Sequence, residues 1–263
     1  MFEEITIESK YYYHNLVSLM MLGMWIYIGV KGYNLKNEIL KHRLSVWIIA
    51  CCLIQESIDF MNRIFLDPNY TFSIQRDIPF LQFCQLSFYF SLLCIFLTKK
   101  NVTATGSYSI NQFLFDSAFL LGFSGAFQGI LTPDFFNINN IVGVICIQLQ
   151  HSLIILNIIW LICAYNYKLK FKGICLTYFL INLIAPFALL LNNFLGTNSV
   201  GDSSNYFYVN ELPKVDNFFL NFVSQYPSPD YILYIQPIFI IYFFSLYIPF
   251  LLFNTFKKII PKE

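Results

Sequence analysis

Seven long runs of apolar residues, separated by polar segments, take up most of the chain. A helix needs roughly 20 mostly apolar residues to cross the hydrocarbon core of a bilayer, and the runs have about this length. The pattern therefore predicts a single all-α domain, a polytopic membrane protein with seven transmembrane helices. The predicted spans are approximately residues 15–31, 44–62, 78–98, 111–131, 139–165, 172–195 and 231–256.

The basic residues between the runs indicate how the chain crosses the bilayer. Most of the 16 lysines and arginines are in the first, third and fifth connections and in the C-terminal tail, whereas the N-terminal segment and the other connections hold most of the acidic residues. Connections rich in lysine and arginine stay on the cytoplasmic side. The sequence therefore predicts an N-terminus outside the cell, a cytoplasmic C-terminus and a location in the cell membrane.

The composition agrees with a protein whose solvent is lipid. The chain of 263 residues is 57% hydrophobic and only 12% charged, whereas about a quarter of the residues of a soluble domain are charged. Its net charge of +1 provides no basic field, so nucleic acid is not an expected partner. The expected partners are membrane lipids.

The cysteines and the N-terminus limit the class further. All seven cysteines fall within apolar runs, and an odd set of this kind does not predict a disulfide framework. No Cys-x-x-Cys pair or His-rich tract indicates zinc, and we expect neither a metal nor another cofactor. The acidic N-terminus lacks the basic region of a cleavable signal peptide, so the first apolar run is expected to remain as a helix.

The third predicted helix contains a concentration of polar side chains. Its sequence FLQFCQLSFYF holds Gln82, Cys84 and Gln85 close together, although polar groups are costly in the bilayer. Cys84 is expected about two turns, or ~10 Å, from the outer end of the span. This cost is avoided if the two carboxamides and the thiol face the interior of the bundle instead of lipid.

Four other predicted helices carry polar residues in their outer or central parts, whereas the inner halves are nearly all Leu, Ile and Phe. Intramembrane polar residues usually face a bundle interior or a water-filled cavity. The distribution therefore predicts one polar pocket that opens toward the outer leaflet. Besides the third helix, we expect it to involve Gln55, Glu56, Asp59 and Arg63 from the second helix, Gln128 from the fourth, His151 from the fifth and Asn193 from the sixth.

Several of these residues also have a purely structural explanation. A buried cysteine usually behaves as a small apolar side chain, and His151 could simply hydrogen-bond to a neighbouring helix. Glu56, Asp59 and Arg63 share one helix face, and we interpret them as a structural ion pair rather than a proton relay.

Two further features are interpreted as structural. Gly122, Gly125 and Gly129 lie at the outer end of the fourth helix, where glycine allows another helix to approach closely. His14 and His42 lie at the edges of the membrane and are expected at the surface.

Four segments of the chain carry a family pattern. They are GFSGAFQGILTPDF, QHSLIILNIIWL, NNFLGTN followed by NYFYVNELP, and PSPDYILYI. In this order and spacing they resemble the YwaF-like family of bacterial integral membrane proteins, and the resemblance covers most of the chain from about residue 50 onward. That family is similar in turn to the eukaryotic transmembrane protein 164, understood as a cysteine-centred acyltransferase that remodels phospholipids.

The resemblance implies a membrane-embedded acyltransferase that moves a fatty acyl chain from a phospholipid to a lipid acceptor. Cys84 would accept the acyl chain as a thioester, and His151 would be its base. The chain departs from the family pattern in two places. Gln82 stands where the family often has a histidine before the cysteine, with Pro79 displaced by one position, and residues 199–204 are inserted.

The implied chemistry needs a base, because a thiol buried among apolar groups stays protonated. His151 would take the thiol proton, and the thiolate would attack an ester carbonyl and release a lysolipid. An acceptor hydroxyl would then collect the acyl chain, and carboxamides would stabilise the oxyanion. The expected substrate-binding residues are Gln82, Gln85, Gln128, Asn193, Asn198, Tyr206, Gln55 and Glu56.

Other functions remain compatible with the same residues. The acceptor could be a glycolipid or a sterol glycoside. With water as the acceptor the protein would be a lipid hydrolase, in which Thr132 or Thr197 could matter more than Cys84. A non-enzymatic transporter or receptor would bind a solute in the same pocket. However, the sequence lacks the half-to-half repeat of many transporters, and the seventh predicted helix lacks a lysine for a retinal Schiff base.

Overall fold

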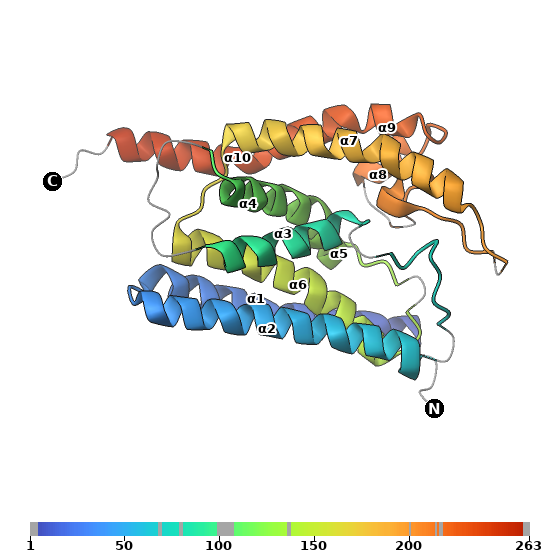
Figure 1. Cartoon of the computed structure of the whole chain (residues 1–263), viewed down its shortest axis with the longest axis horizontal. Helices are drawn as coiled ribbons and strands as arrows, with labels where there is room; N and C mark the ends of the chain where they lie inside the picture. The colour runs from blue at the N-terminus through green and yellow to red at the C-terminus, as the bar shows by residue number, and fades with distance from the viewer. Residues whose placement is uncertain are drawn as a thin grey trace.

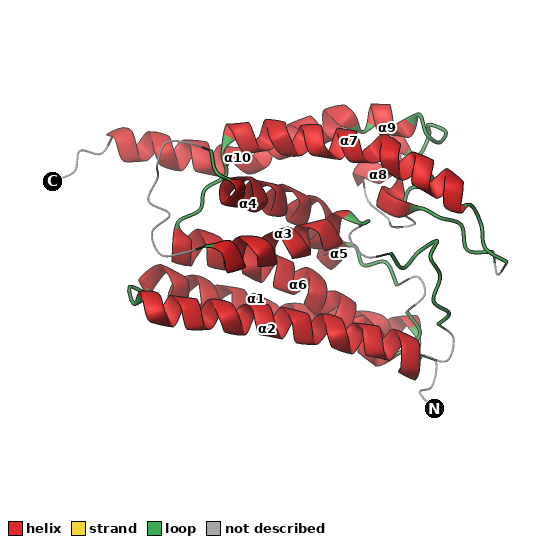
Figure 2. Cartoon of the chain, in the orientation of Figure 1, coloured by secondary structure: helices red, strands yellow, loops and turns green. Residues whose placement is uncertain are grey.

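The computed structural model of the chain describes residues 5–67, 70–78, 81–98, 108–135, 138–199, 201–213, 215 and 218–259. Pro79 lies outside these residues. Within them the protein is all-helical, as predicted, and no β-strand occurs apart from an isolated bridge between Thr197 and Ser203 (Figure 2). The helices are α1 (Ile7–Asn34), α2 (Glu38–Met61), η1 (Asn62–Leu66), α3 (Phe83–Leu97), α4 (Ile110–Leu121), η2 (Gly122–Ala126), α5 (Phe127–Leu131), α6 (Ile141–Tyr165), α7 (Phe171–Leu195), η3 (Tyr206–Tyr208), α8 (Phe218–Val223), α9 (Tyr231–Tyr234) and α10 (Gln236–Ile259).

Six helical segments in the described part of the chain are long and apolar enough to cross a membrane, and the chain is a multi-pass membrane protein. Each segment overlaps one of the predicted spans. The first begins earlier than predicted, because the Thr6 hydroxyl caps α1 by accepting a hydrogen bond from the Ser9 N–H. The segments are Ile7–Asn34, Glu38–Leu66, Ile110–Leu131, Ile141–Tyr165, Phe171–Leu195 and Tyr231–Leu252.

The remaining predicted span, residues 78–98, contains the shorter apolar helix α3 of 15 residues. At 1.5 Å per residue α3 is about 22 Å long, less than the ~30 Å of a typical hydrocarbon core. The structure therefore differs from the prediction in giving this segment a helix that is shorter than the others.

α3 begins only at Phe83 because the backbone before it is bonded to a distant loop. The Ile78 N–H donates to the Tyr206 hydroxyl at 2.8 Å, and the Leu81 carbonyl accepts a hydrogen bond from the Phe207 N–H at 3.1 Å. These backbone groups find their partners outside a helix, so Ile78 and Leu81 lie before α3 and not within it.

α6 is the central helix of the bundle. α1 and α2 pack along one side of α6, and α3 also packs against it and against α4 (Figure 1). α7 packs on α4, and α10 contacts α7. Trp160 of α6 is fully buried, and its indole N–H donates to the Ser45 hydroxyl of α2 at 2.9 Å. The core of the protein is therefore built around α6.

Large apolar side chains cover the outer faces of the peripheral helices. Leu19, Trp47, Phe194 and Ile241, from α1, α2, α7 and α10, are between 67% and 86% exposed. Such a surface is a liability in water, but it is the surface that a lipid-facing helix presents.

A buried carboxylate joins α4 to the segment that leads into α7. Asp116 is fully buried and accepts hydrogen bonds from the Tyr108 hydroxyl at 2.8 Å, the Gln112 side chain at 2.8 Å and the Lys170 N–H at 3.2 Å. Gly173 leaves room for it, because a Cβ there would overlap the Asp116 carboxylate. The three donors satisfy a group that would otherwise be costly to bury.

Three connections of the chain gather at one end of the bundle (Figure 1). The described parts of residues 67–82, 132–140 and 196–230 lie there, and we call this the loop end. The α1–α2 and α6–α7 connections lie at the opposite end.

Candidate active site

A cavity of about 510 Å³ lies toward the loop end of the bundle. Its walls come from α2, α3, η2, α5, α6, α7, α9 and α10 and from the loop between α7 and α9. Its volume is in the range of typical small-molecule sites. Cys84 and His151 both line it.

Cys84 lies in the first turn of α3, because the helix begins at Phe83. The N–H groups of a first helical turn lack intrahelical partners, and the helix dipole places partial positive charge there. The predicted position about two turns into the helix is therefore wrong, because the helix starts later than the apolar run.

Two glycines in one helix face make room for Cys84 and His151. A Cβ added at Gly125 of η2 would lie 3.1 Å from the Cys84 nitrogen, and a Cβ added at Gly129 of α5 would lie 2.6 Å from Cε1 of the His151 ring. Residues at i and i+4 lie on one helix face, about 5–6 Å apart. Cys84 and His151 therefore contact neighbouring positions of the same wall.

The imidazole of His151 forms no hydrogen bond within the described part of the chain. It contacts Gly129 through its ring, and it borders the cavity. Both ring nitrogens therefore remain available to a thiol, a water molecule or a ligand.

Three of the predicted carboxamides also line the cavity, namely Gln82, Gln85 and Gln128. The Gln128 side-chain NH₂ lies 3.3 Å from the Tyr242 hydroxyl. The Gln85 side-chain carbonyl is buried and accepts no hydrogen bond from the described residues. The cavity wall thus brings together carboxamides from α3 and α5 with the Cys84 thiol.

Two predicted residues of α2 do not line the cavity and instead join α2 to α6. The Gln55 side chain donates to the Cys146 carbonyl at 3.0 Å, and Glu56 accepts a hydrogen bond from the Gln150 side chain at 2.6 Å. Of the four residues in these two contacts, Gln150 is the one that lines the cavity.

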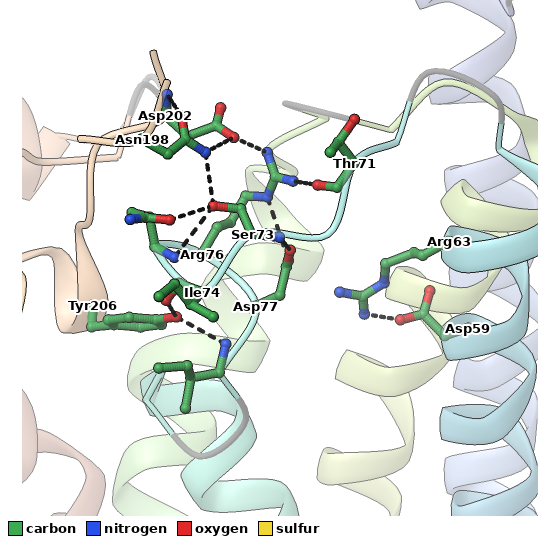
Figure 3. A network of polar contacts seen from close by, with 12 residues as sticks. Asp59, Arg63, Thr71, Ser73, Ile74, Arg76, Asp77, Asn198, Asp202 and Tyr206 are labelled. Atoms are coloured by element: carbon green, nitrogen blue, oxygen red, sulfur yellow. Dashed lines mark hydrogen bonds and ion pairs between the residues drawn. The ribbon is translucent and has the colours of Figure 1, made fainter. Parts of the chain in front are cut away.

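The other three predicted residues lie beside the cavity, in the α7–α9 loop and at the end of α7. Asn193 belongs to a separate polar depression of about 330 Å³. The Asn198 side chain donates to the Ser73 hydroxyl at 3.0 Å, and the Tyr206 hydroxyl donates to the Ile74 carbonyl at 2.7 Å. Asn198 and Tyr206 thus fasten this loop to the segment before α3 (Figure 3).

Two ion pairs line the cavity on its polar side. Arg63 pairs with Asp59 one turn earlier, as predicted for this helix face. Arg76 pairs with Asp77 in the segment before α3, with 3.4 Å between the Arg76 Nε and a carboxylate oxygen. Figure 3 shows the Arg63 guanidinium pointing from the α2 side toward the segment that carries Asp77. We call these four residues the charged rim.

Further contacts fix the Arg76 side chain. It donates to the Thr71 carbonyl at 2.6 Å and lies 3.5 Å from an oxygen of Asp202. Burial alone would lower the pKa of Arg76, but the carboxylates of Asp77 and Asp202 outweigh it and raise that pKa. Burial and the neighbouring Asp77 raise the pKa of Tyr70, whose ring Arg76 overlies, to about 12. Arg76 therefore remains charged and Tyr70 neutral near pH 7.

His14 was expected at the surface, but it is only 2% exposed, so that expectation is wrong. Its Nε2 lies 3.0 Å from the Ile130 carbonyl oxygen of α5, next to the glycine that contacts His151. The sequence does not indicate that His14 is buried, because α1 carries apolar residues on all its faces and none of them is marked as the inner face. His42 is exposed, as predicted.

Sequence reasoning also missed Arg76, Asp77 and Tyr208 as cavity residues. Arg76 and Asp77 lie in a loop and Tyr208 lies in the three-residue η3, and in neither does a periodic pattern indicate which way a side chain points. Tyr208 belongs to NYFYVNELP, so the only signal for it was its place in one of the four segments that carry the family pattern.

Among the described residues, no group of three or more His, Cys, Asp or Glu side chains could hold a metal ion. The fold and the cavity define a class: a multi-pass helical membrane protein with a cysteine and a histidine in the wall of one internal cavity. The family model of the TMEM164 family matches residues 9–247, which is most of the chain, and the protein belongs to this family. Searches of curated proteins and of solved structures found no match.

Proposed function

We propose that the protein is a membrane-embedded acyltransferase that moves a fatty acyl chain from a phospholipid donor to a lipid acceptor through a thioester on Cys84. His151 is the base in this proposal. The observation that supports it most strongly is the pair of glycines at i and i+4, which places Cys84 and His151 against neighbouring positions of one cavity wall.

In the first half of the reaction, a nitrogen of His151 takes the proton of the Cys84 thiol. The sulfur attacks the carbonyl carbon of the donor ester, and the carbonyl π electrons move onto oxygen to give an oxyanion. When the oxyanion collapses, the bond to the glycerol oxygen breaks, and the imidazolium returns its proton to that oxygen. The products are the Cys84 thioester and a lysolipid.

In the second half, the hydroxyl of the acceptor lipid takes the place of the thiol. His151 accepts the hydroxyl proton while the oxygen attacks the thioester carbonyl. Collapse of the second oxyanion breaks the carbon–sulfur bond, and the proton passes from His151 to the Cys84 sulfur. The enzyme is thereby restored, and no redox partner or metal takes part in either half.

The two sides of the cavity suit an amphipathic substrate. Ile181 and Ala185 of α7, with Ile238 and Phe239 of α10, form an apolar wall for acyl chains, whereas the charged rim lies near the polar loops. A lipid that enters sideways between helices would keep its chains in the membrane and its ester groups near Cys84. This arrangement supports a lipid substrate over a small polar solute.

We further propose that α3 is a seventh span and that the loop end faces the outside of the cell. Its short length is tolerable because α3 is enclosed by protein, and Phe88, Ser91 and Cys94 of this helix are fully buried. The lysine-rich α1–α2 and α6–α7 connections lie at the opposite end of the bundle, which the charge rule assigns to the cytoplasm. The cavity would then serve the outer leaflet.

The test uses the full chain in nanodiscs that contain a phosphatidylcholine with a labelled acyl chain and an unlabelled lysophospholipid. We expect the wild type to label the acceptor and Cys84→Ala to abolish labelling without loss of expression or folding. Cys51→Ala is the control, because Cys51 is exposed on α2 and lies outside the cavity. Transfer at the wild-type rate by Cys84→Ala would overturn the assignment, and label released only as free fatty acid would indicate a hydrolase.

A further inference from the structure

The phenol of Tyr208 differs from those of three other tyrosines in or near the cavity wall. The hydroxyls of Tyr206, Tyr231 and Tyr242 each donate a hydrogen bond to a backbone carbonyl. Tyr208 lines the cavity and is 37% exposed, and its hydroxyl has no hydrogen-bond partner among the described residues. Its hydroxyl is therefore free to bind a ligand in the cavity.

The backbone at Tyr208 has an unfavourable conformation. Phe207 and Tyr208 have φ angles of 55° and 52°, which lie in the left-handed region. Bulky side chains rarely adopt this region, and two consecutive residues do so even more rarely. Strained backbone of this kind persists only where its surroundings enforce it, and it occurs preferentially at functional sites.

Several hydrogen bonds enforce this conformation. The buried Asn192 side chain accepts from the Tyr206 N–H at 2.9 Å and donates to the Tyr206 carbonyl at 3.1 Å. The Tyr206 hydroxyl is bonded to the segment before α3 (Figure 3), and the Tyr231 hydroxyl donates to the Tyr208 carbonyl. The segment is thus fixed from α7, from α9 and from the segment before α3.

The same contacts bring Tyr208 next to the start of α3. The Phe207 N–H donates to the Leu81 carbonyl at 3.1 Å, and the rings of Phe207 and Phe83 meet edge to face with 5.2 Å between their centroids. Phe207 and Phe83 immediately precede Tyr208 and Cys84 in the chain. Because Phe207 contacts Phe83, the residues that follow them, Tyr208 and Cys84, lie close together in the wall of the cavity.

We infer that Tyr208 is a catalytic residue whose phenol donates a hydrogen bond to the oxyanion that forms when the Cys84 sulfur attacks an acyl carbonyl. The inference rests on the proposed function of Cys84. The phenol keeps its proton throughout, so it adds no proton transfer to the two half-reactions. A donor fixed in advance toward developing charge is worth most in a site from which water is excluded.

The electrostatics of Tyr208 agree with this role. Burial raises the pKa of Tyr208 above its ordinary value, and the neighbouring Cys84 and Asp134 raise it further. The phenol therefore remains a neutral hydrogen-bond donor at physiological pH.

The experiment compares two reactions of the same thiol in Tyr208→Phe and wild-type protein. The full chain in phosphatidylcholine nanodiscs with a fluorescent acyl chain, without acceptor, reports the rate of acylation of Cys84. Iodoacetamide reports alkylation, which displaces iodide at a saturated carbon and forms no oxyanion. We expect Tyr208→Phe to slow acylation about 100-fold or more, with an unchanged half-saturating donor concentration and an unchanged rate of alkylation.

The matched control is Tyr234→Phe, because Tyr234 is exposed, stacks on Tyr226 and does not line the cavity. Removal of the Tyr208 hydroxyl breaks no hydrogen bond of the described chain, so the variant should fold. Wild-type acylation in Tyr208→Phe, or equal slowing of acylation and alkylation, would overturn the catalytic role and leave the proposed function intact. If wild-type Cys84 acquires no acyl chain, both proposals fail.

Discussion

The backbone of Cys84 and the ring of His151 contact neighbouring positions of one helix face, at Gly125 and at Gly129. Both residues face the same cavity, although they come from α3 and α6. The glycines permit this arrangement because any larger side chain at either position would occupy the space of the thiol-bearing helix or of the imidazole. In this account they are part of the active site, whereas the sequence interpretation treated them only as helix-packing residues.

Gly129→Ala should reduce acyl transfer about 100-fold while the protein stays folded. The added Cβ would lie 2.6 Å from the His151 ring, so the ring must move, and displacements of about 1 Å at a catalytic group can cost this much. Initial rates of acyl transfer in nanodiscs and a thermal unfolding curve measure the two effects.

Gly23→Ala in α1 is the matched control for that variant. No atom lies within 4 Å of a Cβ added at Gly23, and alanine has a higher helix propensity than glycine. Its activity should equal that of the wild type. Equal activity of Gly129→Ala and Gly23→Ala would show that acyl transfer does not depend on the position of the His151 ring against Gly129.

Arg63→Ala should raise the KM for the phospholipid donor about tenfold and leave kcat within a factor of two. We propose that the charged rim binds the polar end of the phospholipid, since a guanidinium binds phosphate more specifically than an ammonium group does. Steady-state kinetics with increasing donor in mixed micelles give both constants. Lys36→Ala is the control, since Lys36 is exposed at the opposite end of the bundle. An unchanged KM would exclude Arg63 from substrate binding.

Much of the fold could be predicted from the sequence, because lipid imposes a simple rule. Long apolar runs must be helical where water is absent, and six of the predicted spans correspond to long apolar helices. The start of α3 could not be predicted in this way. It depends on hydrogen bonds of Ile78 and Leu81 with Tyr206 and Phe207, which are far away in the chain.

The candidate site could be predicted only in part, and for a related reason. Cys84, His151 and the three predicted glutamines of the cavity are polar residues within apolar runs, so their cost in lipid indicates a shared interior position. Arg76 and Tyr208 lie in the connections between the long helices, where many residues are polar and no such cost exists. Their side chains reach the cavity only because Asn192, Asn198 and Tyr206 fold the loops onto the bundle.

Asn192→Ala should lower the stability of the protein by about 1–3 kcal/mol, because it leaves buried backbone groups of Tyr206 without partners. Activity should fall further than stability, since the same bonds position the loop that carries Tyr208. Thermal unfolding and initial rates separate the effects. Asn182→Ala, on the same helix, removes one bond within the described part of the chain, to the Tyr178 carbonyl, and should change neither stability nor activity by much. Full activity of Asn192→Ala would contradict the role given to the loop.

Asp116→Ala should destabilise the protein by about 1–3 kcal/mol or more, because it leaves buried hydrogen-bond donors without an acceptor. The specific activity of the folded protein should stay the same. Asp116 does not line the cavity, and it holds α4 to the segment before α7. The exposed Asp230→Ala is the control. A loss of specific activity without a loss of stability would mean that Asp116 acts in the reaction.

The central claim is that the acyl chain passes through Cys84, and intact-protein mass spectrometry tests it most directly. Wild-type protein is mixed with a phospholipid donor in the absence of acceptor and is denatured at once in acid. The account predicts a mass gain of one acyl chain, located on the peptide with Cys84 and removed by neutral hydroxylamine. No gain, or the same gain in Cys84→Ala, would contradict it.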